Sequence, residues 1–261
     1  MVPLVIGGIL LLPTELLAAG MALVISVGLW EWSKMVPLHT CTARTAFLVI
    51  GLALAGLIWL ISPAAVILAL LLAAFLWWLW VLFWLTHFEI TTQPSIHVTA
   101  LKLAGGYLVM LPAWTALIVL HGRAEDGPLI TLFLLVVVWL ADSGAYFAGQ
   151  RWGSRKLAPV ISPGKTWEGV YGAMVTSGIF ALVAGLLYSH SLPWTAGLVM
   201  VTMVTVMFSI AGDLLESLMK RQCGIKDSGN IIPGHGGILD RIDSLTAAAP
   251  VFLLGLHWMQ L

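Results

Sequence analysis

The apolar and polar residues of this chain are arranged in long blocks. Apolar stretches lie near residues 1–12, 16–31, 45–61, 64–85, 101–120, 128–149, 169–188, 194–215 and 244–261. A helix needs roughly 20 apolar residues to cross the hydrocarbon core of a bilayer. The pattern therefore predicts an all-α, polytopic integral membrane helical bundle of about nine transmembrane helices. The first block is short and is interrupted by Pro13 and Glu15, so eight helices remain if it does not span.

The composition supports this fold class. The 261 residues are 60% hydrophobic and only 9% charged, with a mean hydropathy of +1.01. A water-soluble domain of this length needs far more charge to cover its surface. The net charge is zero, which does not favour a nucleic-acid partner. Cys41 and Cys223 are too few for a disulfide framework or a zinc site. Any chemistry is therefore expected in or beside the lipid bilayer.

The twelve Lys and Arg residues indicate how the chain is oriented. When successive loops alternate between the two sides of the membrane, only Arg123 is separated from the other basic residues. The positive-inside rule places the basic side in the cytoplasm, so segments 150–168 and 216–243 are predicted to be cytoplasmic loops. The tryptophans between residues 77 and 84 are expected to form an interfacial aromatic belt.

The charged residues divide the chain into two regions. Residues 1–120 are predicted to be scaffold helices, and residues 121–261 a catalytic membrane region. From Asp142 to Asp243 the chain carries eight of its twelve basic and seven of its twelve acidic residues. Mixed charge at a membrane surface suits a phosphate-rich substrate with its metal ion, whereas anchoring uses basic residues alone. Solvated loops are the alternative, but several of the acids lie inside apolar helices, which favours a site.

A polar stripe is predicted at the end of the eighth apolar block. Four polar residues there are spaced at i, i+3, i+4 and i+7 and so share one helix face: Asp213, Glu216, Ser217 and Lys220. Arg221 follows directly. Intramembrane carboxylates normally pair, face a wet cavity or bind a cation. A structural salt bridge would need fewer members, so the stripe favours a functional site.

A glycine-rich segment connects this stripe to the last span. Lys226 opens it, residues 234–237 read Gly-His-Gly-Gly, and residues 240–243 read Asp-Arg-Ile-Asp. Glycines let backbone N–H groups approach a phosphate closely, and the histidine either contacts phosphate or caps a turn. Asp240 and Asp243 share one helix face. Carboxylates gathered at a membrane surface suit Mg²⁺, which prefers oxygen ligands and keeps substrate phosphates in its coordination shell.

Two upstream segments complete the candidate site. Residues 162–169 read Ser-Pro-Gly-Lys-Thr-Trp-Glu-Gly, but the phosphate-binding P-loop needs a glycine where Pro159 stands. A short loop at a helix start remains, in which Lys165 and the flanking hydroxyl groups can grip one phosphate. Asp142 ends an apolar run, and it is either a helix-end residue at the interface or part of the site.

These segments resemble the signature of the bacterial phosphatidate cytidylyltransferases, also called CDP-diglyceride synthases. The resemblance is carried by Ser-Leu-Met-Lys-Arg at 217–221, Lys-Asp at 226–227 and His-Gly-Gly-Ile-Leu-Asp-Arg-Ile-Asp at 235–243. Residues 139–146 and 162–169 are also similar to the family. The resemblance implies that CTP and phosphatidic acid give CDP-diacylglycerol and pyrophosphate with Mg²⁺. It further implies a homodimer in the lipid bilayer of the bacterial inner membrane, with the active site facing the cytoplasm.

The expected mechanism is attack of the lipid phosphate on the α-phosphorus of CTP, with departure of pyrophosphate. Because both reactants are anions, positioning and charge neutralisation dominate such a transfer. Asp213 and Asp240 are predicted to be the primary metal ligands and Asp243 a further ligand, while Asp142 orients the site or holds a second cation. The residues predicted to bind or neutralise the substrates are Ser162, Lys165, Thr166, Ser217, Lys220, Arg221, Lys226, His235, Gly236, Gly237 and Arg241.

Two rival functions fit parts of the pattern. A cation-coupled secondary membrane transporter also carries intramembrane acids, but it usually places them near the midplane and has repeated halves. Here the acids gather by one face of the membrane and the halves differ. A CDP-alcohol phosphotransferase is disfavoured because its aspartate-rich motif is missing. The pattern therefore favours a cytidylyltransferase.

Overall fold

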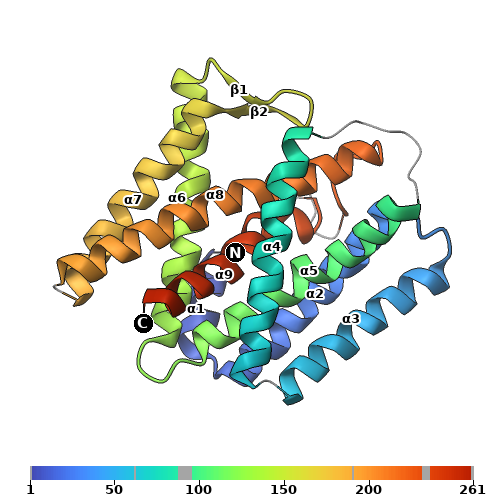
Figure 1. Ribbon diagram of the computed structural model, residues 1–261, viewed down its shortest axis with the longest axis horizontal. Helices are drawn as coiled ribbons and strands as arrows, with labels where there is room; N and C mark the ends of the chain where they lie inside the picture. Colours follow the sequence, from blue (N-terminus) through green and yellow to red (C-terminus); the bar gives the residue numbers. More distant parts are fainter. Residues whose placement is uncertain (1, 62, 88–95, 190, 231–235, 260–261) are drawn as a thin grey trace.

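A computed structural model gives the fold of the chain and describes residues 2–61, 63–87, 96–189, 191–230 and 236–259. These residues form nine α-helices and two short β-strands (Figure 1). Among the described helices, eight are long and apolar enough to cross a membrane. The predicted polytopic helical bundle is thereby confirmed, with eight candidate spans instead of nine.

The helices follow the apolar blocks of the sequence. Their bounds are α1 (Val2–Leu11), α2 (Thr14–Met35), α3 (Cys41–Ile61), α4 (Ala64–His87), α5 (Ile96–His121), α6 (Gly127–Trp152), α7 (Trp167–Ser189), α8 (Leu192–Gln222) and α9 (Leu239–Met259). The first helix has 10 residues, which is too short to cross a bilayer. It is held by the buried His121, whose ring nitrogens lie 2.8 Å from the carbonyl oxygen of Ile9 and 2.9 Å from the hydroxyl of Thr14.

The largest differences from the predicted boundaries concern α8 and α9. Helix α8 has 31 residues and continues to Gln222, well past the end of its apolar block, and α9 already begins at Leu239. Hydropathy decreases where charged residues begin, but a helix continues as long as its backbone hydrogen bonds and packing do. The polar stripe of residues 213–220 therefore lies on a helix, as its spacing predicted, and Asp240 and Asp243 lie in the first turns of α9.

A β-hairpin, which the sequence did not predict, joins α6 to α7. Strand β1 (Lys156–Ala158) pairs antiparallel with β2 (Ser162–Thr166), with Lys156 opposite Thr166 and Ala158 opposite Ser162. The base of the hairpin is fixed by Glu168, which accepts a hydrogen bond of 2.8 Å from the Ser154 hydroxyl. Residues 162–166, which were expected to form a loop, are thus a β-strand that is paired with β1 and leads directly into α7.

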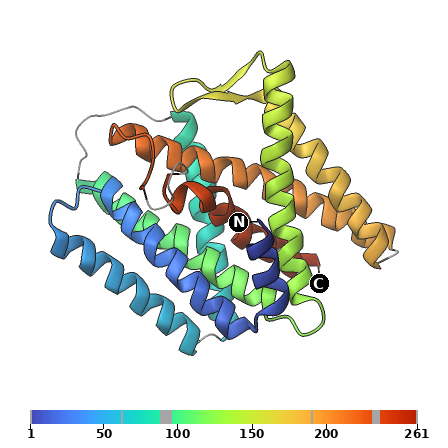
Figure 2. The same cartoon turned by 180° about the vertical axis from the view of Figure 1, so that it is seen from behind.

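Helix α9 lies at the centre of the bundle, where it packs against α2, α4, α5, α6 and α8 (Figures 1 and 2). Most of its residues are buried. Helices α8 and α9 approach each other closely at Gly212, where a side chain would collide with the backbone oxygen of Asp243. The small residue therefore brings the polar stripe of α8 next to the first turns of α9.

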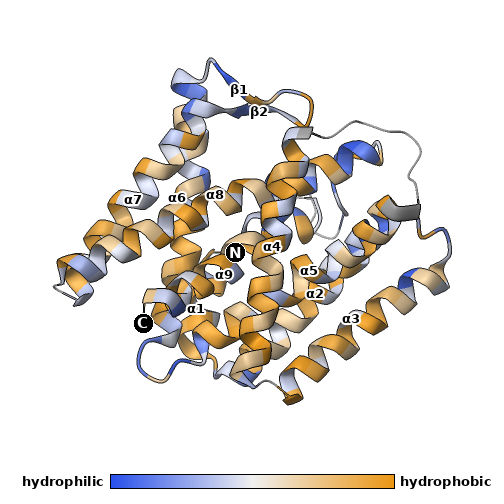
Figure 3. Cartoon of the chain, viewed as in Figure 1, coloured by the Kyte–Doolittle hydropathy of each residue, from blue (hydrophilic) through white to orange (hydrophobic). Residues whose placement is uncertain are grey.

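The hydrophilic residues are unevenly distributed over the fold. Figure 3 shows mostly apolar helices, with hydrophilic residues at the hairpin and at the C-terminal end of α8. Helices α6 and α7 pack side by side beneath the hairpin, where Gly144 and Gly172 leave no room for a side chain. The outer face of α7 exposes many large apolar side chains, as expected for a helix in contact with lipid.

Candidate active site

The candidate site lies where the β-hairpin, the C-terminal half of α8 and the first turns of α9 meet (Figure 1). Two contacts connect these elements directly. Lys165 of β2 forms an ion pair of 2.5 Å with Asp213 of α8, and the Arg221 guanidinium donates to the carbonyl of Ile161 over 3.3 Å. The two segments predicted to lie on one side of the membrane are therefore in contact with each other.

Asp213 is the centre of the first group of polar side chains. One of its oxygens faces Lys165, and the other accepts a hydrogen bond of 3.3 Å from the Ser217 hydroxyl one turn later on α8. Asp142 on α6 and Asp243 on α9 both lie within electrostatic range of Asp213 and Lys165. Three carboxylates from three helices thus lie within electrostatic range of one lysine.

Asp240 is the centre of the second group. Lys220 Nζ lies 2.6 Å from Asp240 Oδ1 and 3.2 Å from Glu216 Oε1, so the lysine bridges α8 and α9. Asp240 Oδ2 accepts hydrogen bonds from the backbone N–H groups of Ser228 and Gly237, at 3.0 and 2.7 Å. This carboxylate therefore fixes both the lysine and the loop that precedes α9.

Glu216 joins the two groups. It is 2% exposed, and its carboxyl group interacts with those of Asp240 and Asp243 as well as with Lys220. It belonged to the predicted polar stripe but not to the predicted site residues. Its position three residues after Asp213 was the signal that could have identified it.

Glu31 was missed entirely. It lies on α2, in the region predicted to be scaffold, and yet its buried carboxylate accepts a hydrogen bond of 2.8 Å from the backbone N–H of Leu239. Nothing in the local sequence distinguishes Glu31 from any other glutamate near a helix end. Only the folded arrangement of α2 against α9 brings it to the loop.

Gly236 and Gly237, which were expected to lie against a phosphate, lie against side chains of the protein itself. Gly236 has a left-handed backbone with φ of +80°, and a side chain there would stand 2.7 Å from an oxygen of Asp240. A side chain at Gly237 would overlap the Ser228 hydroxyl and approach both oxygens of Glu31. These two glycines thus allow the loop to close on the protein's own carboxylates, and their contact with a ligand stays a prediction.

The other predicted residues are more dispersed. Thr166 is buried, and its hydroxyl accepts the backbone N–H of Gly169, so it caps the start of α7. Lys226 and Arg241 are exposed on either side of the loop, and Ser162 is half-buried at the start of β2. His235 lies outside the described residues.

The side chains that gather here fit a hard divalent cation. Carboxylates outnumber lysines in the two groups, and oxygen ligands are those that Mg²⁺ prefers. Within the described part of the chain, no group of three Asp, Glu, His or Cys side chains is already arranged around a common point.

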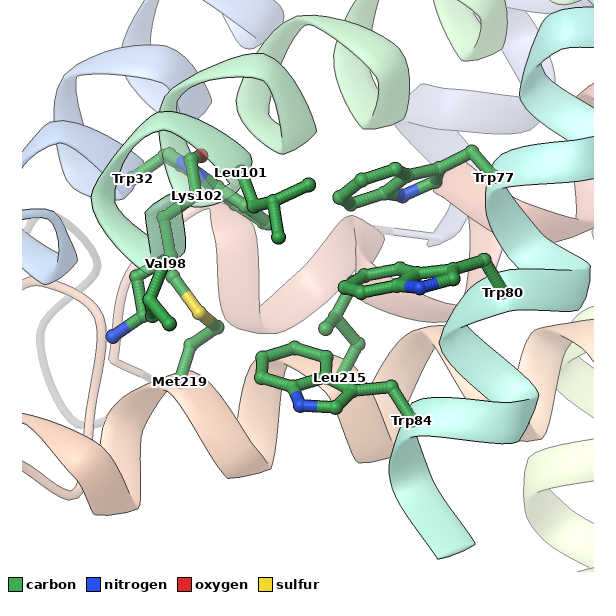
Figure 4. Close-up of a pocket in the computed structure, with 9 residues that line it drawn as sticks. All are labelled: Trp32, Trp77, Trp80, Trp84, Val98, Leu101, Lys102, Leu215 and Met219. Carbon is green, nitrogen blue, oxygen red and sulfur yellow. The ribbon is translucent and has the colours of Figure 1, made fainter. Parts of the chain in front are cut away.

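A cavity of about 60 Å³ lies beside the site, on another face of α8 (Figure 4). Its wall includes Trp77, Trp80 and Trp84 of α4, whose neighbouring rings are 5.1 and 5.3 Å apart, and they face Lys102 of α5 and Met219 of α8. Trp78 is fully buried and so does not fit the expected interfacial aromatic belt, whereas Trp77, Trp80 and Trp84 are half-buried and line the cavity. For these three residues the interfacial position stays a prediction.

Fold and site together define a multi-pass membrane protein with carboxylates and lysines gathered at one end of its helical bundle. The profile of the Cytidylyltransferase family matches residues 1–259 of the chain. The chain therefore belongs to the cytidylyltransferase family.

Within this family, the chain is similar to several proteins that share one name. The chain is 40% identical to the phosphatidate cytidylyltransferase of Pseudomonas aeruginosa over 256 residues, 97% of this chain and 92% of that protein. It is 35% identical to the protein of the same name from Haemophilus influenzae, over 90% of this chain and 88% of the other. The Bacillus subtilis protein of that name is 47% identical over 134 residues, about half of each chain. The resemblance predicted from the sequence motifs is confirmed.

Proposed function

We propose that this protein transfers the cytidylyl group of CTP to phosphatidic acid, giving CDP-diacylglycerol and pyrophosphate. The observation that carries this proposal is the 40% identity to a phosphatidate cytidylyltransferase over almost the whole chain. The signature residues 217–221 and 240–243 meet at one site, as a shared reaction centre requires. A cation-coupled transporter is not supported, because the family and the similar proteins above are cytidylyltransferases.

The chemistry requires that two anions be held together. An oxygen of the lipid phosphate attacks the α-phosphorus of CTP, and the bond from that phosphorus to the pyrophosphate oxygen breaks. The protein need not supply a nucleophile, because the lipid phosphate is one. Lys165 and Lys220, each now paired with a carboxylate, can turn to the substrate phosphates and neutralise them. Lys226, Arg221 and Arg241 are exposed and add further positive charge near the site.

We propose further that Asp213, Asp240 and Asp243 hold Mg²⁺ and that Asp142 orients the site or holds a second cation. The ion would stabilise the negative charge that develops on the phosphate oxygens. Asp240 Oδ2 is occupied by hydrogen bonds from the loop, whereas Oδ1 accepts a hydrogen bond from Lys220. A carboxylate oxygen has two lone pairs, so Oδ1 can still serve as a ligand.

The cellular setting follows from the same reasoning. The relatives are bacterial proteins, and eight apolar helices make this a multi-pass membrane protein. We propose that it lies in the bacterial inner membrane with the site facing the cytoplasm, because the basic residues gather at the site end. The family resemblance implies that it acts as a homodimer.

A labelling experiment tests the reaction. Purified protein in detergent micelles with phosphatidic acid should move label from α-³²P CTP into the organic-solvent extract. Label from γ-³²P CTP should stay in the aqueous phase, because it leaves with pyrophosphate. Reactions without phosphatidic acid serve as the control. Absence of α-label from the lipid fraction, or its presence without added phosphatidic acid in delipidated protein, would overturn the assignment.

Removal of divalent ions should stop the reaction. With EDTA in excess over all divalent cations, lipid labelling is expected to fall to the level of a reaction without protein, since the carboxylates then have no ion to share with the phosphates. Added Mg²⁺ should restore it. EDTA saturated with Mg²⁺ beforehand controls for other effects of the chelator. Turnover that persists in excess EDTA contradicts the metal role.

A further inference from the structure

The buried Glu31 is the strongest unassigned feature of the molecule. It is 0% exposed and lies near the C-terminal end of α2, far in sequence from the signature motif. A carboxylate is rarely buried so completely unless other groups hold it. Groups that surround it belong to the segment between α8 and α9 and to the first residue of α9.

One oxygen of Glu31 organises that segment directly. Oε2 accepts a hydrogen bond of 2.8 Å from the backbone N–H of Leu239 and lies 3.2 Å from the Ser228 hydroxyl. Leu239 is the first residue of α9, so the carboxylate occupies the place of an N-terminal cap supplied by another helix. A negative group is also favoured there by the helix dipole.

The loop is shaped to close around this side chain. A side chain at Gly229 would collide with Glu31 Oε1, and one at Gly237 would stand 2.6 Å from each carboxylate oxygen. Oε1 itself has no hydrogen-bond partner within the described part of the chain. The carboxyl group therefore fills a cradle of glycines, and its hydrogen bonding depends on Oε2.

The same loop groups also hold Asp240. The backbone N–H groups of Ser228 and Gly237, two residues that lie around Glu31, donate hydrogen bonds to Asp240 Oδ2. Asp240 Oδ1 accepts a hydrogen bond from Lys220. The Ser228 hydroxyl lies 3.0 Å from Asp240 Oδ2 and has a single proton, so it donates to Asp240 or to Glu31 at any moment. A displacement of the loop at Glu31 is thus transmitted to the carboxylate and the lysine of the site.

We propose that Glu31 is a positioning residue of the reaction, which sets the first turn of α9 and thereby the placement of Asp240 and Lys220. This inference rests on the function proposed above. It assigns a residue from the scaffold half of the chain to the site. Glu31 acts through its hydrogen-bond acceptor and through the space it fills, and it does not contact the reacting phosphates.

Three substitutions of Glu31 test this role against a matched control. Glu31→Ala removes the acceptor, Glu31→Asp withdraws it by one methylene, and Glu31→Gln keeps one acceptor oxygen in place. Glu15→Ala changes an exposed glutamate of the same helix. The measurements are kcat and KM for both substrates, the midpoint of thermal unfolding in detergent, and hydrogen–deuterium exchange of peptides that contain Leu239.

The expected pattern is a loss of turnover that follows the acceptor. Glu31→Ala should lower kcat by roughly 10- to 100-fold, because a small misplacement of a reacting group is sufficient for such a loss. Peptides containing Leu239 should exchange faster. Glu31→Asp should show the same changes more weakly with an unchanged unfolding midpoint, and it remains informative if the alanine variant does not fold. Glu31→Gln and Glu15→Ala should stay close to wild type.

Several results would overturn the proposal. Wild-type kcat in Glu31→Ala or in Glu31→Asp does so, as does faster exchange at Leu239 with unaltered turnover. Equal loss of kcat in Glu31→Gln and Glu31→Ala would show that the acceptor is not what matters, and it counts against the proposal too. If the wild-type protein labels no lipid, the proposed function fails by itself, and exchange at Leu239 then decides alone whether Glu31 holds the loop.

Discussion

Replacing Asp213 by asparagine is expected to abolish cytidylyl transfer while the protein stays folded. The charge that a bound metal ion stabilises in a phosphoryl-type transfer is worth several kcal/mol, so kcat should fall roughly a thousandfold or more. Stability should change little, because the ion pair of Asp213 with Lys165 is partly exposed, at 32% and 24%. Such pairs contribute only about 0–1 kcal/mol.

The measurement combines lipid labelling with thermal unfolding in detergent. Asp126→Asn is the matched control, because it makes the same substitution in the loop between α5 and α6, at the end of α6 opposite the hairpin (Figure 1). Its side chain contacts Arg123 and Tyr188, neither of which belongs to the predicted site. Substantial turnover by Asp213→Asn at a normal unfolding midpoint would remove Asp213 from the metal site.

Asp240→Asn is expected to cost both turnover and stability. Three groups around Asp240 can only donate: Lys220 Nζ at Oδ1, and the backbone N–H groups of Ser228 and Gly237 at Oδ2. An asparagine has one acceptor oxygen, so its amide NH₂ must point at one of these donors. Loss of one partner from an ion pair that is only 11% and 15% exposed typically destabilises by about 3 kcal/mol or more.

Asp213→Asn and Asp240→Asn should therefore differ in stability but not in activity, so both properties must be measured. Both should lose lipid labelling, but only Asp240→Asn should unfold at a clearly lower temperature than wild type. Asp126→Asn again serves as the control for both readouts. An Asp240→Asn protein that is as stable as wild type would contradict a stabilising role of the hydrogen bonds around Asp240. One that is also active would exclude Asp240 as a ligand.

Much of the candidate site could be predicted because its groups are close in sequence or share one helix face. The i, i+3, i+4 and i+7 spacing placed Asp213, Glu216 and Lys220 on one face of α8, and the three-residue spacing did the same for Asp240 and Asp243 on α9. The grouping of basic residues predicted that segments 150–168 and 216–243 lie on the same side of the membrane, and the hydrogen bond from Arg221 to the Ile161 carbonyl shows that these segments are in contact. Helical periodicity and hydropathy are local properties, so they can be read from the chain alone.

The predictions that needed more than local pattern were less complete. The hairpin was missed because residues 156–166 have no alternating apolar pattern, and its pairing depends on contacts such as Ser154 with Glu168. The hydroxyl of Thr166 caps α7, a role that the sequence did not predict, and its contact with phosphate stays a prediction. Of the tryptophans of α4 that were expected to form an interfacial belt, Trp78 is buried by tertiary packing, and Trp77, Trp80 and Trp84 line a cavity between α4, α5 and α8.

The sequence by itself determined that this is a helical membrane protein of the cytidylyltransferase family, because apolar block length sets the spans and the signature motif is continuous in the chain. Only the tertiary structure decided what surrounds each polar group. Glu31 is separated from Leu239 by 208 positions, and the two residues form a hydrogen bond only because α2 packs beside α9. The physical reason is that a buried carboxylate needs hydrogen-bond donors, and the fold can supply them from residues far away in the sequence. A local sequence pattern does not show which distant residues these are.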